Sequence, residues 1–221
     1  MGKRGPKPKG AVKIRWSANF AYAIGLLATD GCLSKDGRHV DFTSKELEQL
    51  RNFKQCLELN VKIASKRSGR GDRWQFRIQF GDVLLYRFLL NIGFMPAKSK
   101  VIGALDIPPR YLFDFLRGHF DGDGSFHSYW DPRWKSSFMF YTTFVSASKT
   151  HIDWLRTMIS DSLGIRGHIT KSRNASVYQL KYAKADSLKL LRKLYYNNRV
   201  VCLSRKRVKV ERALAAVGEK L

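Results

Sequence analysis

Two stretches of this chain are alike, and together they decide the fold: Phe20-Ala-Tyr-Ala-Ile-Gly-Leu-Leu-Ala28, which runs into Thr29-Asp30-Gly31, and Tyr111-Leu-Phe-Asp-Phe-Leu-Arg-Gly-His-Phe120, which runs into Asp121-Gly122-Asp123-Gly124. Each predicts an apolar helix that ends at an Asp-Gly pair. Gly25 and Gly118 precede that Asp by five residues in both stretches. Similarity at the spacing of a domain indicates that one structural unit occurs twice in the chain.

The elements that follow the two stretches also match. Each half shows the pattern helix, two strands, helix, two strands, helix. Residues 45–59 and 149–163 are expected to form equivalent helices, and Asp82 and Asp186 are expected to open the next pair.

The spacing between the halves changes along the chain. Asp30 and Asp123 are 93 residues apart, whereas Trp74 and Tyr178, which begin similar strands, are 104 residues apart. We therefore expect an insertion in the second half, in the loop around residues 129–136.

One predicted strand, residues 73–80, alternates between polar and apolar side chains. Its polar face carries two Arg and two Gln, and its apolar face carries four large side chains that suit a core covered by helices. The predicted fold class is α+β, with two pseudo-twofold-related αββαββα repeats, each an antiparallel sheet backed by helices. The expected boundaries are 1–16 for a basic arm, 17–106 for the first repeat and 107–221 for the second.

The charge balance indicates a polyanionic partner. The 221 residues contain 41 Lys and Arg against 18 Asp and Glu, which gives a net charge of +23. Nucleic acid fits this excess better than a membrane surface, because no long basic amphipathic helix stands out. Three cysteines at wide spacings favour a reducing compartment.

No segment of the sequence predicts a membrane span or a secretory signal. The apolar run 20–28 is too short to cross a bilayer, and Asp30 follows where a signal peptide would need small residues. We expect a location at DNA, in the cytoplasm or an organelle matrix, and no secretion.

Residues 1–16 carry six positive charges and no acid, and their Gly and Pro oppose regular structure. We interpret them as a disordered basic arm. Arg4-Gly5-Pro6 is similar to minor-groove inserts of the AT-hook type, and a solvated tail with nonspecific phosphate contacts is the other interpretation.

Packing of the two apolar helices would bring two carboxylates together. Small residues on both helices, Gly25 and Gly118 among them, would allow close contact about a pseudo-twofold axis, so that Asp30 and Asp123 converge at one end. The glycine after each Asp is expected to stop its helix with a positive φ. Two carboxylates beside two helix C-termini form a negative spot that Mg²⁺ or Mn²⁺ would neutralise, and a metal centre that faces nucleic acid suits phosphodiester hydrolysis.

The segments Ala23-Ile-Gly-Leu-Leu-Ala-Thr-Asp-Gly31 and Leu116-Arg-Gly-His-Phe-Asp-Gly-Asp-Gly124 resemble the two motifs of single-chain LAGLIDADG homing endonucleases. The resemblance covers residues from about 17 to 212. It implies a monomer, encoded within an intron, whose two sheets form a saddle over the major groove of a long asymmetric double-stranded DNA target. It also implies cleavage of both strands across the minor groove, which leaves short 3′ overhangs.

The resemblance further implies a set of site residues. The last acid of each motif, Asp30 or Asp123, would bind Mg²⁺, and Mn²⁺ or Ca²⁺ could occupy the same site. The neighbouring backbone groups would complete the metal site, those of Thr29, Gly31, Gly122 and Gly124. Polar residues after the second strand of each repeat would order the water network, namely Ser44 and Ser148. Basic residues near the final helix would support the site, namely Lys98 or Lys100 in the first repeat and Arg205 or Lys206 in the second.

The expected DNA contacts lie on strands and hairpins of both repeats. Arg suits guanine and Gln suits adenine in the major groove, whereas an ordinary solvated sheet face is the alternative. The expected contact residues are Arg38, His39, Lys66, Arg70, Arg73, Gln75, Arg77, Gln79, Ser125, His127, Tyr129, Lys135, Lys171, Gln179 and Lys181.

The two motifs are unequal, because the earlier acidic position holds Asp121 in the second motif and Ala28 in the first. We therefore expect unequal halves. An intron maturase that binds structured RNA and a DNA-binding regulator that has lost catalysis are alternatives with the same fold. Both terminal acids are present, which favours the endonuclease.

Overall fold

The computed structural model describes residues 10–67, 74–171 and 176–221. The expected DNA contacts Arg70 and Arg73 lie outside the described residues. Within these ranges, no helix is long and apolar enough to cross a membrane.

The first half contains α1 (Ala18–Asp30), β1 (Gly31–Leu33), β2 (His39–Ser44), α2 (Leu47–Cys56), β3 (Ala64–Arg67), β4 (Trp74–Gly81), α3 (Val83–Asn91) and the 3₁₀ turn η1 (Lys98–Lys100). The second half contains the 3₁₀ turn η2 (Pro109–Tyr111), α4 (Leu112–Gly122), β5 (Ser125–Trp130), β6 (Phe138–Ser146), α5 (Lys149–Leu163), β7 (His168–Lys171), β8 (Tyr178–Tyr182), α6 (Lys184–Leu194) and α7 (Ser204–Ala215). The strand orders β1-β2-β4-β3 and β5-β6-β8-β7 are equivalent, and the neighbouring strands are antiparallel. The predicted α+β fold class is therefore confirmed.

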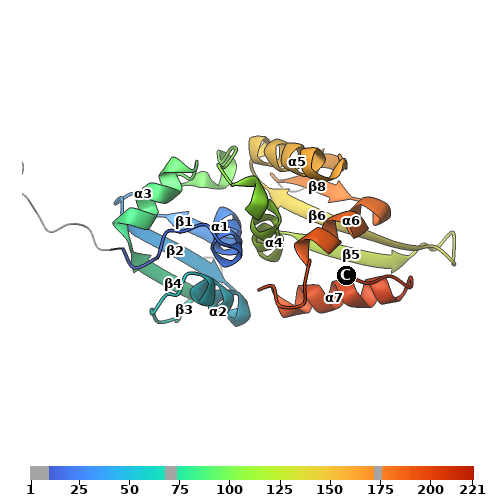
Figure 1. The fold of residues 1–221 in the computed structure, drawn as a ribbon, viewed down its shortest axis with the longest axis horizontal. Coiled ribbons are helices and arrows are strands. Elements are labelled where there is room, and N and C mark those ends of the chain that lie inside the picture. The colour runs from blue at the N-terminus through green and yellow to red at the C-terminus, as the bar shows by residue number, and fades with distance from the viewer. Residues whose placement is uncertain (1–9, 68–73, 172–175) are drawn as a thin grey trace, which may run out of the picture.

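The two motif helices, α1 and α4, lie side by side at the centre of the molecule, with one sheet on either side (Figure 1). Ser17 caps α1, because its side-chain oxygen accepts a hydrogen bond from the Phe20 N–H. Every residue from Phe20 to Ala28 is buried, since α1 is surrounded by α4, α2 and the first sheet. A helix covered on all sides explains why this segment is apolar throughout and has no polar stripe.

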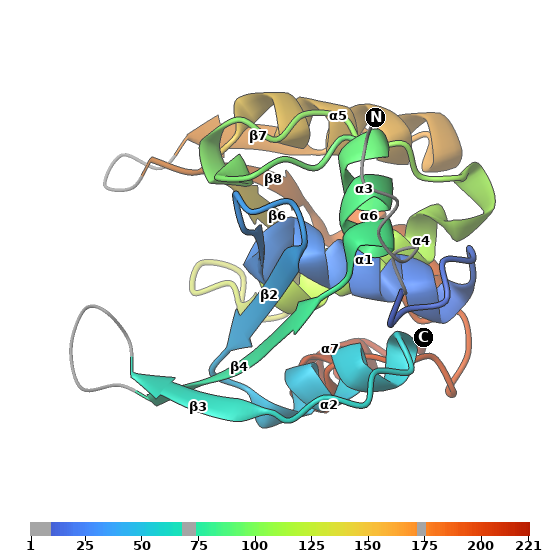
Figure 2. The same cartoon turned by 90° about the vertical axis from the view of Figure 1, so that its left-hand side faces the viewer.

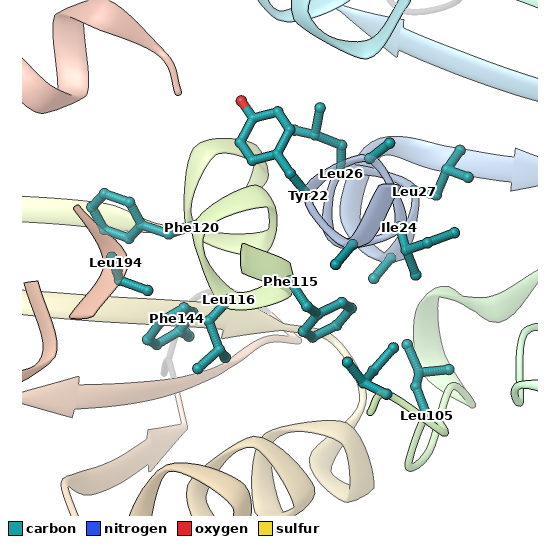
Figure 3. Packing of buried hydrophobic residues seen from close by; sticks show 14 of the residues in the cluster. Tyr22, Ile24, Leu26, Leu27, Leu105, Phe115, Leu116, Phe120, Phe144 and Leu194 are labelled. Carbon is teal, nitrogen blue, oxygen red and sulfur yellow. The ribbon is translucent and has the colours of Figure 1, made fainter. Parts of the chain in front are cut away.

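Two glycines let the central helices touch through their backbones. A Cβ built on Gly25 would lie 2.1 Å from the Phe115 carbonyl oxygen, and one built on Gly118 would lie 2.0 Å from the Tyr22 carbonyl oxygen. Leu26, Phe115 and other apolar side chains pack around this contact (Figure 3). The predicted close helix pair is thus present, and no side chain larger than hydrogen fits at its crossing.

The glycines after the motif acids act differently from our expectation of a positive φ. Gly31 has φ −84° and ψ 155°, and Gly124 does not adopt a positive φ either. Their hydrogens instead make room for the preceding helical turn, since a Cβ would lie 2.6 Å from the Leu27 carbonyl oxygen or from the Phe120 Cα. Close packing, and not left-handed backbone, selects glycine at both positions.

The expected insertion lies in the β5–β6 hairpin, which projects beyond the rest of the second half (Figure 1). Cys32 pairs with Asp41 in the first hairpin, and the equivalent Ser125 pairs with Thr143 in the second. Equivalent residues of the two halves are therefore 93 residues apart before this hairpin loop and 102 apart after it, whereas the sequence predicts 104.

The same register corrects the alignment of the later strands. Ser44 pairs with Phe76, and Ser146 pairs with Tyr178. Ser146, and not Ser148, is therefore the counterpart of Ser44. The alignment predicted from the sequence is thus wrong by two residues. A shift of two residues keeps every side chain on the same face of a strand, so the alternation of polar and apolar residues is the same for both alignments.

Most helix boundaries follow the sequence. The helix expected over 149–163 is α5, and the one expected over 45–59 is the shorter α2. Asp82 caps α3 as expected, because its carboxylate accepts a hydrogen bond from the Leu85 N–H at 2.8 Å. Asp186 does not open α6, which begins at Lys184 after the N-cap Ala183.

The second part of the predicted disordered arm is ordered against the first half. Ala11 and Val12 donate backbone hydrogen bonds to the Asp82 carboxylate at 2.6 and 2.9 Å. Val12 is buried, and Trp16 packs edge-on against Phe20. The buried acid that caps α3 thus also holds residues 11 and 12, while residues 1–9 lie outside the described residues.

The close helix contact predicts that Gly25→Ala loses about 3 kcal/mol of unfolding free energy, near the upper end of the cost of overpacking, because the obstructing atom belongs to backbone. Chemical denaturation monitored by circular dichroism would measure this loss. Gly103→Ala is the matched control, since a Cβ there meets no atom within 4 Å, and its stability should stay within roughly 0.5 kcal/mol of wild type. Equal stability of the two variants would contradict the proposed backbone contact.

Candidate active site

The two motif acids lie at the adjoining ends of the central helices. Asp30 is the last residue of α1, and Asp123 is the C-cap of α4. The helices remain close at this end, since a Cβ built on Gly122 would lie 2.0 Å from Thr29 Oγ1 and 3.1 Å from Asp30 Oδ2. The structure thus brings the two carboxylates into one neighbourhood.

The environment of Asp30 disfavours its negative charge. Burial is the main cause, the charge of Asp123 adds to it, and together they raise the pKa of Asp30 to about 7. The charges of Lys98 and Lys206 act in the opposite direction but do not outweigh burial. A carboxylate with a raised pKa beside a second carboxylate is a place where a cation binds favourably.

A buried lysine lies against each helix end. Lys98 Nζ donates a hydrogen bond to the Thr29 carbonyl at 3.0 Å. Lys206 Nζ donates to several carbonyls at the end of α4, including those of Gly122 at 3.3 Å and Gly124 at 2.7 Å. These ammonium groups satisfy carbonyls that a helix end leaves unpaired and offset its negative dipole. Burial lowers the pKa of both lysines to about 8.

The structure distinguishes between the basic residues that the sequence left as alternatives. Lys98 and Lys206 are 5% and 6% exposed and contact the helix ends, whereas Lys100 is exposed. Arg205 forms an ion pair with Glu46 across the two halves, with Nε 2.7 Å from Oε2. It also lines a cavity of about 240 Å³ together with Asp30 and Gly122, so it lies beside the site.

Gln49 of α2 contacts Asp30 but was not among the predicted site residues. Its Nε2 donates to Asp30 Oδ2 at 3.5 Å, and its Oε1 accepts a hydrogen bond from Ser44 Oγ at 2.5 Å. Ser44 therefore does not contact Asp30 directly but supports Gln49, which lies between them. The sequence offered little signal for Gln49, because several polar residues follow Ser44 and only burial singles this one out.

Ser148 lies in a different environment from the one expected for it. It is the N-cap of α5 and 1% exposed, and its hydroxyl donates to the Ile102 carbonyl at 2.5 Å. The equivalent N-cap in the first half is Glu46, because the backbone N–H of Glu46 and that of Ser148 each bond the hydroxyl of the serine two residues earlier. The true counterpart of Gln49 is therefore His151, whose Nδ1 lies 2.8 Å from the Gly103 carbonyl.

Asp121, the earlier acid of the second motif, is buried at the interface between the helices. Its Oδ2 accepts hydrogen bonds from the Tyr22 hydroxyl at 2.8 Å and from the Leu203 N–H at 2.7 Å. Burial is the main reason that the pKa of Asp121 rises to about 6. This carboxylate connects α4 to α1 and to Leu203, the residue before α7. Helix α7 in turn carries Lys206.

The donor set at the helix ends suits a hard divalent cation. Two carboxylates and nearby backbone carbonyls supply oxygen ligands of the kind that Mg²⁺, Mn²⁺ and Ca²⁺ prefer. Among the described residues, no group of three or more His, Cys, Asp or Glu side chains is arranged to hold a metal ion. A cation here would therefore be held by Asp30 and Asp123 with backbone, water or phosphate oxygens. Of the expected backbone ligands, the carbonyls of Thr29, Gly122 and Gly124 already accept hydrogen bonds from the buried lysines.

The expected DNA contacts lie on the outward faces and hairpins of the two sheets. On β4, Ile78 and Phe80 face the core, and Gln79 on the other face is exposed. Trp74 lies on the same face as Ile78 and Phe80, but at the strand end this face is not covered and Trp74 is 61% exposed. Eight expected contacts are exposed: Arg38, Lys66, Gln79, Ser125, His127, Tyr129, Lys135 and Lys171. Five are half-buried: His39, Gln75, Arg77, Gln179 and Lys181.

Comparison with known proteins identifies the fold. Residues 17–93 match the family model of the LAGLIDADG-like domain, and none of the curated proteins matches this chain in sequence. A mesophilic variant of the homing endonuclease I-DmoI matches with a TM-score of 0.53 and 16% identity, over 82% of this chain and 97% of its own. The homing endonuclease I-WcaI, bound to its DNA recognition sequence, matches with a TM-score of 0.58 and 13% identity, over 88% of each chain.

Full-length DUF199/WhiA from Thermatoga maritima shares the same fold, with a TM-score of 0.55 and 16% identity over 91% of this chain. This chain spans 64% of the length of that protein. The fold is thus that of single-chain LAGLIDADG homing endonucleases and also of WhiA, so the fold alone does not assign an activity.

The raised pKa of Asp30 predicts a pH-dependent gain of stability in Asp30→Asn without divalent cations. Ionised Asp30 disfavours the folded state, so wild type loses stability as the pH rises from about 4 to about 7, and the variant avoids this loss. Thermal or urea unfolding in EDTA should show the variant to be more stable at pH 8, by roughly 1–3 kcal/mol after allowance for solvent screening, and equal to wild type near pH 4.

Asp36→Asn serves as the comparison with the opposite sign. Hydrogen bonds from His39 lower the pKa of Asp36 to about 2, so ionised Asp36 favours the folded state and the variant should be less stable than wild type at pH 8. Destabilisation of Asp30→Asn at pH 8 would show that Asp30 makes a structural contact that the asparagine cannot replace.

Proposed function

We propose that this chain is a site-specific endonuclease of the homing type, which hydrolyses both strands of a double-stranded DNA target and leaves short 3′ overhangs. The observation that carries the proposal is the pair of carboxylates, Asp30 and Asp123, at the adjoining ends of the central helices. Two acids side by side at the C-terminal ends of two helices are unfavourable, even in a protein of net charge +23, unless a cation joins them there.

Asp30 and Asp123 would hold a divalent cation, Mg²⁺ in the cell, with Mn²⁺ or Ca²⁺ as substitutes. A complex of I-DmoI with DNA has been obtained with Ca, and complexes of two of its variants with Mn and with Mg. When bound, such a cation lowers the pKa of water and stabilises the negative charge that develops on phosphate oxygens.

The residues around the two acids have separate tasks in this proposal. Gln49 orients the Asp30 carboxylate through its amide, and Ser44 in turn fixes that amide. Lys98 and Lys206 neutralise the helix ends and so prevent the two C-termini from repelling the DNA phosphates. Arg205, in the cavity beside Asp30, lies where it can contact a phosphate of the bound strand.

The two sheets would bind the two halves of a long asymmetric target. Each repeat, residues 17–106 and residues 107–221, would contact one half-site through its outward sheet face, so one chain suffices as a monomer. The insertion in the β5–β6 hairpin and the different residues on the two faces support a target whose two halves differ in sequence. The expected setting is an intron-encoded protein that acts at DNA in the cytoplasm or an organelle matrix.

DUF199/WhiA has the same fold as the homing endonucleases, so the fold does not choose between an endonuclease and the alternative of a DNA-binding regulator that does not cleave. Incubation with a plasmid library that carries a long randomised insert, in the presence of Mg²⁺, separates the two functions. Linear products whose inserts share a sequence support the endonuclease. Selective binding of one sequence without any cut strand, in Mg²⁺ and in Mn²⁺, would establish the regulator instead.

The proposal predicts that Asp30→Asn and Asp123→Asn each reduce the cleavage rate by about a hundredfold or more, because each loses a charged ligand of the cation. Binding of the selected DNA in EDTA should persist or tighten, since a carboxylate near phosphate is removed. Gel assays of cleavage and fluorescence anisotropy measure the two effects. Asp161→Asn, an exposed acid on α5, is the charge-matched control and should cut like wild type.

A different result would show that the site is elsewhere. If both variants still cut both strands at the wild-type rate, or if excess EDTA leaves wild-type cleavage unchanged, the two acids do not hold a catalytic cation.

A further inference from the structure

The outward face of the first sheet carries an ion pair between neighbouring strands. Arg77 of β4 donates through Nε to Asp41 Oδ2 of β2 at 2.5 Å, and one of its terminal amines contacts the same oxygen. Thr43, directly opposite Arg77 in the register, donates to the other carboxylate oxygen of Asp41 at 3.0 Å. The Arg77 side chain is 29% exposed and that of Asp41 is 14% exposed, so the pair is largely shielded by its neighbours but open on one side.

An acid at this place is unfavourable for DNA binding as such. The outward face is the surface that the proposed function places over DNA, and a carboxylate there repels phosphates. An ion pair that is open to solvent on one side also adds little stability. The presence of Asp41 therefore requires another benefit.

That benefit is the orientation of Arg77. A free arginine side chain samples many rotamers and binds phosphate wherever it meets one, whereas a carboxylate that holds its Nε edge fixes the plane of the guanidinium. Asp41 uses two of the five N–H donors and leaves three, including the pair at the end of the fork. That pair matches the O6 and N7 acceptors of guanine in the major groove.

We propose that Asp41 is a positioning residue for target recognition: it holds Arg77 for a bidentate contact with one guanine in the half-site under the first sheet. This inference rests on the proposed function. The second sheet lacks the pair, because the register places Thr143 and Gln179 at the corresponding positions. The guanine preference should therefore occur in one half-site only.

Direct reading by Asp41 is the competing role, because a carboxylate can accept a hydrogen bond from the N4 amine of cytosine. The two roles differ in their dependence on Arg77. A positioning residue has no effect once Arg77 is absent, whereas a residue that reads cytosine keeps its effect. A double-mutant cycle over Asp41→Asn and Arg77→Ala separates these roles.

The test is selection of DNA from a randomised duplex library with the full chain in Ca²⁺, followed by sequencing and by affinity measurements on single-base variants of the selected site. Asp41→Asn should lower the preference for guanine at one position by at least about fivefold, the lower end of what a bidentate contact contributes. Its overall affinity should stay equal or rise, because a negative charge is removed. Arg77→Ala should lose the same preference, and the double variant should match Arg77→Ala.

Asp161→Asn, which removes an equal charge from a helix and not from the sheet face, should retain the wild-type preferences. Thermal unfolding of each variant shows whether it is folded, and a general loss of structure would weaken all positions equally and not one. An unchanged guanine preference in Asp41→Asn overturns the positioning role, as does a further loss in the double variant. Failure of the wild-type protein to select any common sequence overturns the proposed function as well. This outcome differs from an unchanged guanine preference in Asp41→Asn, which overturns the positioning role alone.

Discussion

The backbones of α1 and α4 touch at Gly25 and Gly118, where an added methyl group would lie about 2 Å from a carbonyl oxygen of the other helix. The rest of the molecule depends on this contact. Because the two helices cross in equivalent register, their C-terminal ends meet, and the acid at each end meets the other. The two sheets lie on opposite sides of the pair and are fixed relative to one another by it (Figures 1 and 2). A wider separation of the helices would alter the distance between the acids and the angle between the sheets at once.

The junction of two helix C-termini concentrates negative partial charge, which two buried lysines offset. Lys98 and Lys206 turn their ammonium groups onto the carbonyls of the helix ends, while the carboxylates of Asp30 and Asp123 remain available in the same neighbourhood. Burial of both lysines lowers their pKa and would be unfavourable without these carbonyls. The charge of the site is thus divided between lysines that stabilise the fold and acids that can hold a cation.

The sequence predicted the elements whose determinants are local or repeated. The apolar helices, the paired motifs and the alternation of the strands each follow from residue periodicity, and they led to the fold class and to Asp30 and Asp123. The residues that depend on register were predicted less well: Ser148 was paired with Ser44 because a two-residue slip preserves the face of a strand. Gln49 was missed because its role comes from burial against α1, which no pattern within α2 reveals. For Arg77, the sequence showed the face but not the acid on the neighbouring strand.

The contact between the Tyr22 hydroxyl and Asp121 makes the two halves complementary and not interchangeable. By the offset of 93 residues, Tyr22 corresponds to Phe115 and Asp121 to Ala28. Two copies of the first half would therefore bury two hydroxyls opposite alanine, and two copies of the second half would bury two carboxylates opposite phenylalanine. Each arrangement takes from two buried polar groups the hydrogen bond that Tyr22 and Asp121 now share, which costs roughly 1–3 kcal/mol for each group and more for a charged one. The covalent chain keeps the halves together, and this hydrogen bond ensures that each half recognises the other in preference to itself.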